Sequence, residues 1–191
     1  AGAATLSATA LGNFLLMVML GVFIALEPRL YREGFIRLVP VPHRARVSDA
    51  LDDAGRALSG WLKGQALSML FVGLATWIGL ALLGVPLALI LGVLAGVLDF
   101  VPFFGPIVSG LLAVLLAFMQ GPETALSVAV LALAIQQVEG NLLMPVLQRW
   151  AVQLPPALGV LAVVVAGTLL GLPGILFATP LVVVAMVVVR R

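Results

Sequence analysis

The chain has 191 residues, of which 63% are hydrophobic and only 9% are charged, whereas a soluble domain carries about 25% charged residues. A globular protein of this length needs a large polar surface, so the composition excludes a soluble fold and predicts an integral membrane protein. The net charge of +2 does not indicate a nucleic-acid partner, because most of the basic residues lie between Arg29 and Lys63, interleaved with acidic ones. The sequence contains no cysteine, which excludes disulfides and thiolate metal sites.

The N-terminal part is predicted to form one membrane span and a charged connector. The residues from Leu6 to Leu26 are apolar, and about 20 such residues are enough to cross a bilayer, so we expect a span over residues 5–26. Residues 27–63 form a charged segment, with a loop at "VPVPHRAR" and then apolar residues at helical spacing from Val47 to Leu62. This spacing is typical of an amphipathic helix, lying either at the membrane surface or packed on the membrane domain.

Residues 64–191 are predicted to form a helical bundle with two interrupted apolar stretches. Continuous spans are expected over Gly64–Leu83 and Thr124–Leu147. The stretch 86–118 is broken at "DFVPFFGP" and the stretch 155–189 at "GLPG", and a weak similarity at an offset of 69 residues suggests an internal repeat. The halves fit either re-entrant half-helices or pairs of short spans. The predicted fold class is therefore an all-α, polytopic membrane bundle with Gly/Pro-broken helices.

Charge placement predicts the orientation. If residues 27–63 are cytoplasmic, then Arg149 and the pair Arg190–Arg191 return to the same side, whether the broken stretches are hairpins or span pairs. This agrees with the excess of Lys and Arg in cytoplasmic loops of membrane proteins. We therefore expect a multi-pass protein of the bacterial inner membrane, with residues 27–63 and the C-terminus in the cytoplasm.

The segment "IQQVEGNLLMP" (135–145) places four polar side chains inside an apolar span. On a helix, Gln136 and Glu139 share one face, while Gln137 and Asn141 pair on an adjacent face. Pro145 lacks an N–H group and leaves the carbonyl of Asn141 without its helical donor. A charged side chain at the centre of a membrane helix costs about 2.5–3.5 kcal/mol.

Two interpretations of Glu139 stay open. In the first, Glu139 carries protons or ligates a cation, and Gln136, Gln137 and Asn141 supply hydrogen bonds along a substrate pathway. In the second, Glu139 lies near the cytoplasmic end of the span and extends to the surface or pairs with Arg149.

Asp99 is the second candidate, because it immediately precedes the first interruption. It either caps the following half-helix or lines a cavity. The second interruption carries no charge and is expected to serve close helix packing or to expose backbone carbonyls. The predicted helix-break residues are Pro102, Gly105, Pro106, Pro145, Gly171, Gly174 and Pro180.

Enzymatic readings lack their parts. His43, the one histidine, lies outside any predicted span, and Asp99 is the one aspartate in an apolar segment. Neither a Ser–His pair nor a pair of facing aspartates is therefore available in the membrane, and no phosphate-binding glycine loop is present. We expect no enzyme activity, cofactor or metal site.

The segments "LGVLAGVLDFVPFFGPIVSGLLAVLLAF" and "QQVEGNLLMPVLQRWAVQLPPALGVLAVVVAGTLLGLPGILFATPL" resemble the C-terminal half of the autoinducer-2 exporter family, the PerM-like permeases. The upstream "GRALSGWLKGQ" is also similar to that family. The resemblance implies a bacterial inner-membrane secondary transporter, whose motif residues include Asp99, Gln137, Glu139 and Asn141. The family's N-terminal membrane helices have no counterpart here and the chain starts without methionine, so we expect a fragment.

Three functions remain as hypotheses. The first is export of a small polar solute similar to autoinducer-2, with proton coupling. The second is Na⁺ or Li⁺ exchange for protons, and the third is a non-transporting assembly or regulatory role in the membrane. The expected partners are the lipid bilayer, the solute or ions, and further copies of the chain as a homo-oligomer.

Overall fold

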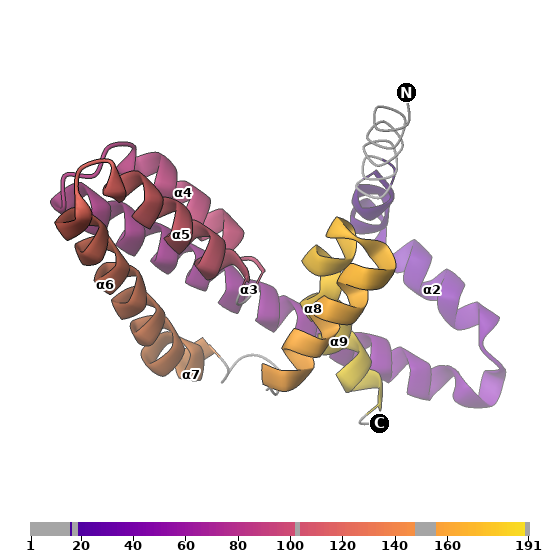
Figure 1. Ribbon diagram of the computed structural model, residues 1–191. Helices are drawn as coiled ribbons and strands as arrows, with labels where there is room; N and C mark the ends of the chain where they lie inside the picture. The colour runs from indigo at the N-terminus through magenta and orange to yellow at the C-terminus, as the bar shows by residue number, and fades with distance from the viewer. Residues whose placement is uncertain (1–15, 17–18, 102–103, 148–155, 190–191) are drawn as a thin grey trace. The chain divides into compact units, whose positions relative to one another are not determined.

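The computed structural model describes residues 16, 19–101, 104–147 and 156–189, and within these ranges the chain is helical with no strand (Figure 1). This confirms the predicted all-α class. The expected span 5–26 lies mostly outside the described residues, although residues 19–26 are helical. The elements are α2 (Pro28–Leu38), the 3₁₀ turn η1 (Val41–His43), α3 (Arg44–Leu82), α4 (Ala88–Leu98), α5 (Phe104–Phe118), α6 (Pro122–Val138), the π-helical turn η2 (Glu139–Leu143), α7 (Met144–Leu147), α8 (Pro156–Leu170) and α9 (Leu172–Val189).

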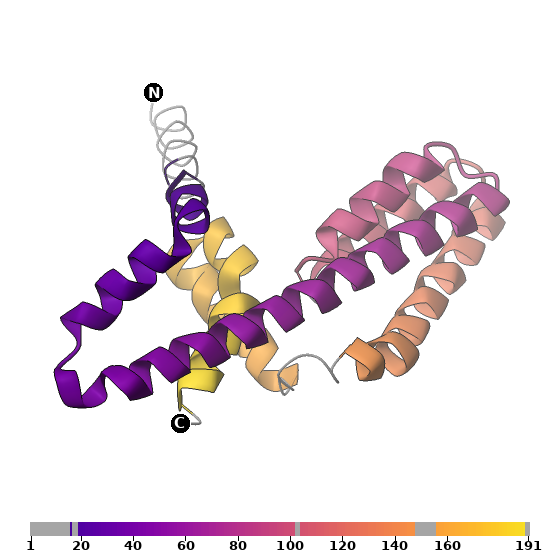
Figure 2. The ribbon, with the colours of Figure 1, turned by 180° about the vertical axis from the view of Figure 1, so that it is seen from behind.

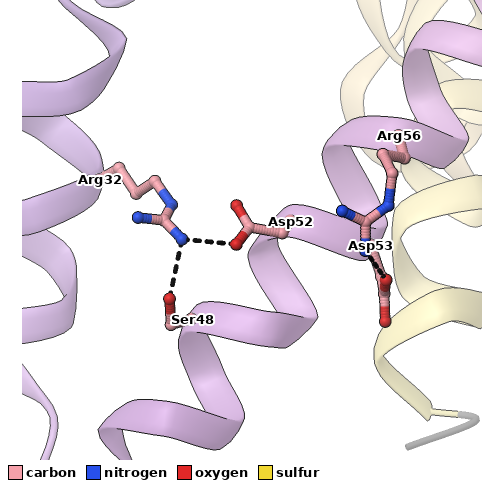
Figure 3. Close-up of polar contacts among 5 residues, drawn as sticks. All are labelled: Arg32, Ser48, Asp52, Asp53 and Arg56. Carbon is pink, nitrogen blue, oxygen red and sulfur yellow. Dashed lines mark hydrogen bonds and ion pairs between the residues drawn. The ribbon is translucent and has the colours of Figure 1, made fainter.

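The chain divides into two compact units, residues 1–52 and 53–191. In the first unit, α2 runs back to the start of α3 and the two are joined by polar contacts. Arg32 on α2 donates to Ser48 Oγ at 2.8 Å and to Asp52 Oδ2 at 2.7 Å (Figure 3). In the second unit, Arg56 pairs with Asp53 one helical turn away. These pairs are partly exposed and contribute little stability individually.

The amphipathic helix and the second span are one continuous helix. α3 runs for 39 residues from Arg44 to Leu82 and is the long helix seen across Figure 2. It ends in a glycine cap, in which Gly84 takes φ +70° and the Val85 N–H donates to the Leu80 carbonyl at 3.0 Å. Such a cap satisfies carbonyls that the last helical turn leaves free.

Helices α3, α4, α5 and α6 pack together in the second unit, and both ribbon views show α3, α4 and α5 side by side (Figures 1 and 2). Their main core contains Leu80, Val85, Ala88, Leu91, Ala113, Ala117, Ala125 and Val128. The contact between α3 and α4 is made by glycines: a methyl group on Gly92 or Gly96 would lie within 3 Å of α3 backbone atoms. The backbones of α3 and α4 therefore approach closely, as small residues allow in membrane helices.

The outer surface of this packing is apolar. Leu111 and Leu115 on α5, and Leu126 and Leu133 on α6, are all more than half exposed. Among the described residues, the helices Val41–Leu82 and Pro122–Val146 are long and apolar enough to cross a membrane. Exposed leucines on every outer face are the expected result when lipid replaces water as the solvent.

Several predicted helix-break residues lie inside helices instead. Gly105 and Pro106 are in the first turn of α5, where the N–H of a proline is not needed. Gly174 lies in the first turn of α9, and Pro180 lies in its interior. The prediction of breaks at Gly174 and Pro180 is therefore wrong: α9 tolerates one missing backbone hydrogen bond because the rest of the helix continues on both sides.

The interruptions themselves have different origins. Gly171 separates α8 from α9 with φ +66°, a conformation that favours glycine. Gly105, by contrast, has no positive φ, and a methyl group there would overlap the Leu98 carbonyl oxygen. Its glycine is needed for close approach and not for an unusual dihedral angle. Pro102 lies outside the described residues.

Candidate functional site

Glu139 opens a π-helical turn in the third span. In this turn the Met144 N–H donates to the Glu139 carbonyl, five residues back, and Pro145 follows directly in α7. Single π-turns inside α-helices occur frequently at functional sites. The Glu139 side chain is only 6% exposed, although it lies in an apolar span.

Two side chains hold the Glu139 carboxylate. Ser68 on α3 donates to Oε1 at 2.7 Å, and Gln136 on α6 donates to Oε2 at 3.3 Å. Each carboxylate oxygen therefore accepts one hydrogen bond, which offsets part of the cost of burial. Of the two interpretations of Glu139, this geometry favours an interior role, since the side chain is directed at α3 and not at solvent. Arg149, the alternative partner, lies outside the described residues.

Asp99 caps the C-terminal end of α4 and is only 2% exposed. Its backbone carbonyl accepts a 2.7 Å hydrogen bond from the buried amide of Gln65 on α3. Its side chain is less well provided for, because the Oδ2 atom is buried without a hydrogen-bond partner. Of the two sequence-based alternatives for Asp99, the arrangement favours an interior site over a helix cap.

Ser68 lies between the two acids. The fully buried hydroxyl that donates to Glu139 is also a hydrogen-bonding neighbour of the Asp99 carboxyl group, and the two carboxyl groups are close enough to repel each other when both are charged. The polar cluster is therefore formed by Gln65, Ser68, Asp99, Gln136 and Glu139, contributed by α3, α4, α6 and η2. No ion pair to either carboxyl is recorded in the part of the chain that the structure describes.

The predicted amides separate into two groups. Gln136 belongs to the polar cluster, whereas Gln137 and Asn141 are exposed. The Asn141 amide donates to Gln137 Oε1 at 2.8 Å, which is the expected spacing of four residues. On this face the amides satisfy each other and do not contact Glu139.

Sequence analysis did not identify Gln65 and Ser68. Both lie at the start of the second span, three residues apart and therefore on one helix face. Polar residues at helical spacing inside an apolar span are a usable signal, but Gln65 had been assigned to the end of the amphipathic helix. The continuity of α3 through this point places both side chains toward the acids.

A cavity of about 570 Å³ adjoins the cluster. It lies between α3, α5 and α6, and most of its lining is aliphatic. Its polar lining comes from Thr76, Ser109 and Gln136, and Gln136 also bonds Glu139. One amide thus connects the buried acid to a space of the size that binds small molecules.

The chemistry available here is that of proton and cation binding. Two carboxyl groups, a hydroxyl and two amides converge in a buried environment, where electrostatic interactions are strong. No group of three or more His, Cys, Asp or Glu side chains suited to holding a metal ion occurs among the described residues.

Comparison with known proteins places this geometry in context. A family model described as AI-2E family transporter matches residues 2–191. PerM of Escherichia coli (strain K12), a proposed permease, is 33% identical over 171 residues, which cover 88% of this chain and 48% of PerM. YueF of Bacillus subtilis (strain 168), a proposed transport protein, is 32% identical over 145 residues, covering 76% of this chain and 39% of YueF. The chain spans half the length or less of these relatives, and no solved structure matches it.

Proposed function

This chain belongs to the AI-2E transporter family, and we propose that it forms the proton-coupled part of a secondary transporter that exports a small polar solute across the bacterial inner membrane. Glu139 is the titratable group in this proposal. The observation that carries it is the burial of Glu139 among uncharged donors, Ser68 and Gln136. An acid held without an ion pair in an apolar bundle can take up and release a proton without breaking a salt bridge.

The cavity between α3, α5 and α6 supplies the solute site in this proposal. Its volume of about 570 Å³ is within the usual range for small-molecule pockets. Gln136 lines the cavity and bonds Glu139, so loss of the Glu139 charge is expected to alter the hydrogen bonding that Gln136 offers to a solute. This supports coupling between the two.

Helix lengths support re-entrant hairpins over span pairs. α4 has 11 residues and α5 has 15, which correspond to about 16 Å and 22 Å at 1.5 Å per residue. Neither reaches the hydrocarbon thickness of about 30 Å. In the proposed topology α4 and α5 enter and leave on one side, and residues 27–63 are cytoplasmic.

Exchange of Na⁺ or Li⁺ for protons is the second candidate. It is favoured by the buried, unpartnered Oδ2 atom of Asp99 beside Glu139, because carboxylate and hydroxyl oxygens are suitable ligands for hard cations. The third hypothesis, a non-transporting assembly role, predicts no flux at all.

The test is proton flux in everted vesicles that contain the full-length protein, followed with a pH-sensitive dye. Glu139→Gln is expected to abolish coupled flux, by about 100-fold or more as for other essential proton-transfer groups. Glu123→Gln is the matched control, since Glu123 lies exposed in the first turn of α6 and its charge has no expected role. Flux driven by sodium or lithium alone supports the cation candidate, and flux that needs an organic solute supports export. Wild-type flux in Glu139→Gln contradicts both.

A further inference from the structure

We propose that Ser68 is a proton relay between Asp99 and Glu139, so that the two carboxyl groups share one proton and act as a single unit. This rests on the proposed function, because it describes how the titratable site of the transporter works. It adds a residue, Ser68, and a second acid, Asp99, to the proton pathway.

The first step of the argument is the hydrogen-bond capacity of Ser68. A hydroxyl carries one hydrogen and two lone pairs. Its hydrogen is committed to Glu139 Oε1 at 2.7 Å, so toward Asp99 the hydroxyl offers a lone pair and is an acceptor. An acceptor facing a carboxyl group is satisfied only when that group carries a proton to donate.

The second step is the difference between the two acids. The Glu139 carboxylate accepts hydrogen bonds on both oxygens, from Ser68 and Gln136. Asp99 has one oxygen, Oδ2, that is buried and without a partner. A buried carboxylate needs donors at both oxygens more than a neutral carboxylic acid does. The arrangement therefore matches a neutral Asp99 beside an ionised Glu139.

The third step is the absence of a compensating cation among the described neighbours. From α3 the cluster is faced by Gln65 and Ser68, and from α6 by Gln136, all of them uncharged. Lys63, the nearest basic residue on α3 in the sequence, is exposed. Two like charges in this setting would repel each other, so one proton held between them is the stable arrangement.

The transfer follows from the chain of hydrogen bonds. The Asp99 O–H bond breaks as its proton passes to the Ser68 oxygen, and the Ser68 O–H bond breaks as its own proton passes to Glu139. The products are an Asp99 carboxylate, an unchanged serine hydroxyl now donating to Asp99, and a neutral Glu139. No net charge is created and no further reactant is needed. The proton thereby moves from the end of α4 to the π-turn that adjoins the cavity.

Gln65 fixes the geometry of this relay. Its buried amide donates to the Asp99 backbone carbonyl at 2.7 Å, and it lies one helical turn before Ser68 on α3. The end of α4 is thereby held against the same helix face that carries the relay hydroxyl.

The closing experiment uses infrared spectroscopy of the purified full-length protein in lipid, with the absorption of protonated carboxyl groups as the readout. This readout does not require transport, so it tests the shared proton even if the proposed function fails. We expect a protonated-carboxyl band at neutral pH that disappears in Asp99→Asn. We expect Ser68→Ala to shift this band, since its hydrogen-bond acceptor is lost, and Ser68→Thr to restore it.

Flux measurements complete the test. Ser68→Ala is expected to slow proton flux by about tenfold or more, as for the loss of a group that transfers a proton, and Ser68→Thr to retain it. Ser59→Ala, an exposed serine on the same helix, serves as the control. A band that survives in Asp99→Asn, or a Ser68→Ala variant with wild-type band and flux, overturns the relay. If Ser68→Ala fails to fold, Asp99→Asn and Ser68→Thr decide the question.

Discussion

The interruption between α4 and α5 lies beside a buried acid, whereas the interruption between α8 and α9 is made by backbone alone. Asp99 is enclosed at the first, while neither α8 nor α9 contains a charged residue. At the first, glycine is needed because Gly105 contacts the Leu98 carbonyl; at the second, because Gly171 takes φ +66°. The two stretches show weak similarity at a constant offset, yet only the first brings polar side chains together. Similar sequence patterns thus give two breaks with different physical causes.

Replacing the two glycines by alanine separates close approach from backbone conformation, and gives the largest expected effect. Gly105→Ala places a methyl group on the backbone of α4, and such overpacking against rigid atoms is expected to cost about 3 kcal/mol. Gly171→Ala meets nothing within 4 Å and is expected to cost about 1–2 kcal/mol from its left-handed dihedral angle. Thermal unfolding of the full-length protein in detergent measures both. Equal losses would mean that the breaks do not differ in this way.

Replacing the prolines tests the same comparison from the second helix of each pair. Pro180 lies in the interior of α9, where a proline removes a backbone hydrogen bond and costs up to about 3 kcal/mol relative to alanine. We expect Pro180→Ala to stabilise the protein by about 2 kcal/mol, a partial recovery of that cost. Pro106→Ala, in the first turn of α5, is expected to have almost no effect. The reverse order in denaturant unfolding would contradict the assigned helix bounds.

The smallest expected effect concerns the amide that holds the first interruption. Gln65→Ala removes a buried hydrogen bond to the Asp99 carbonyl and is expected to cost about 1–2 kcal/mol, since the carbonyl stays buried without a donor. Gln120 makes a matching bond to the Gly84 carbonyl at 3.0 Å, but in an exposed position. Gln120→Ala is therefore expected to change stability by less than about 0.5 kcal/mol, because water replaces the amide. Comparable losses in the two variants would remove the argument for a tightly held α4 end.

The sequence was sufficient to predict the helical class, the membrane setting and the importance of Glu139, because these depend on composition and on helical spacing. It separated Gln136 from Gln137 and Asn141 by helix face, and the structure assigns only Gln136 to the cluster. It could not identify Ser68, because a single serine in an apolar span is common and its partner Glu139 is 71 residues away. Contacts of this range depend on how α3 packs on the bundle, which local patterns do not encode.

The break predictions show the same limit in another form. Pro106, Gly174 and Pro180 were assigned to interruptions because glycine and proline weaken isolated helices. Whether such a residue ends a helix depends on its position within the helix and on the packing around it. Gly171 is the interruption in the second stretch because its φ angle turns the chain, and no residue type alone reveals which glycine takes that angle.

The π-turn at Glu139–Leu143 has a consequence for how this span tolerates changes in length. A π-turn closes its hydrogen bonds one residue later than an α-helical turn, so it stores one residue beyond those that an α-helix would use. Deleting Leu142, an exposed residue of the turn, would convert the turn to an ordinary helix while the flanking faces keep their directions. A deletion elsewhere in Pro122–Val138 would rotate everything after it by about 100°. The span therefore contains one position at which its residue count can change by one without altering what the rest of the helix presents.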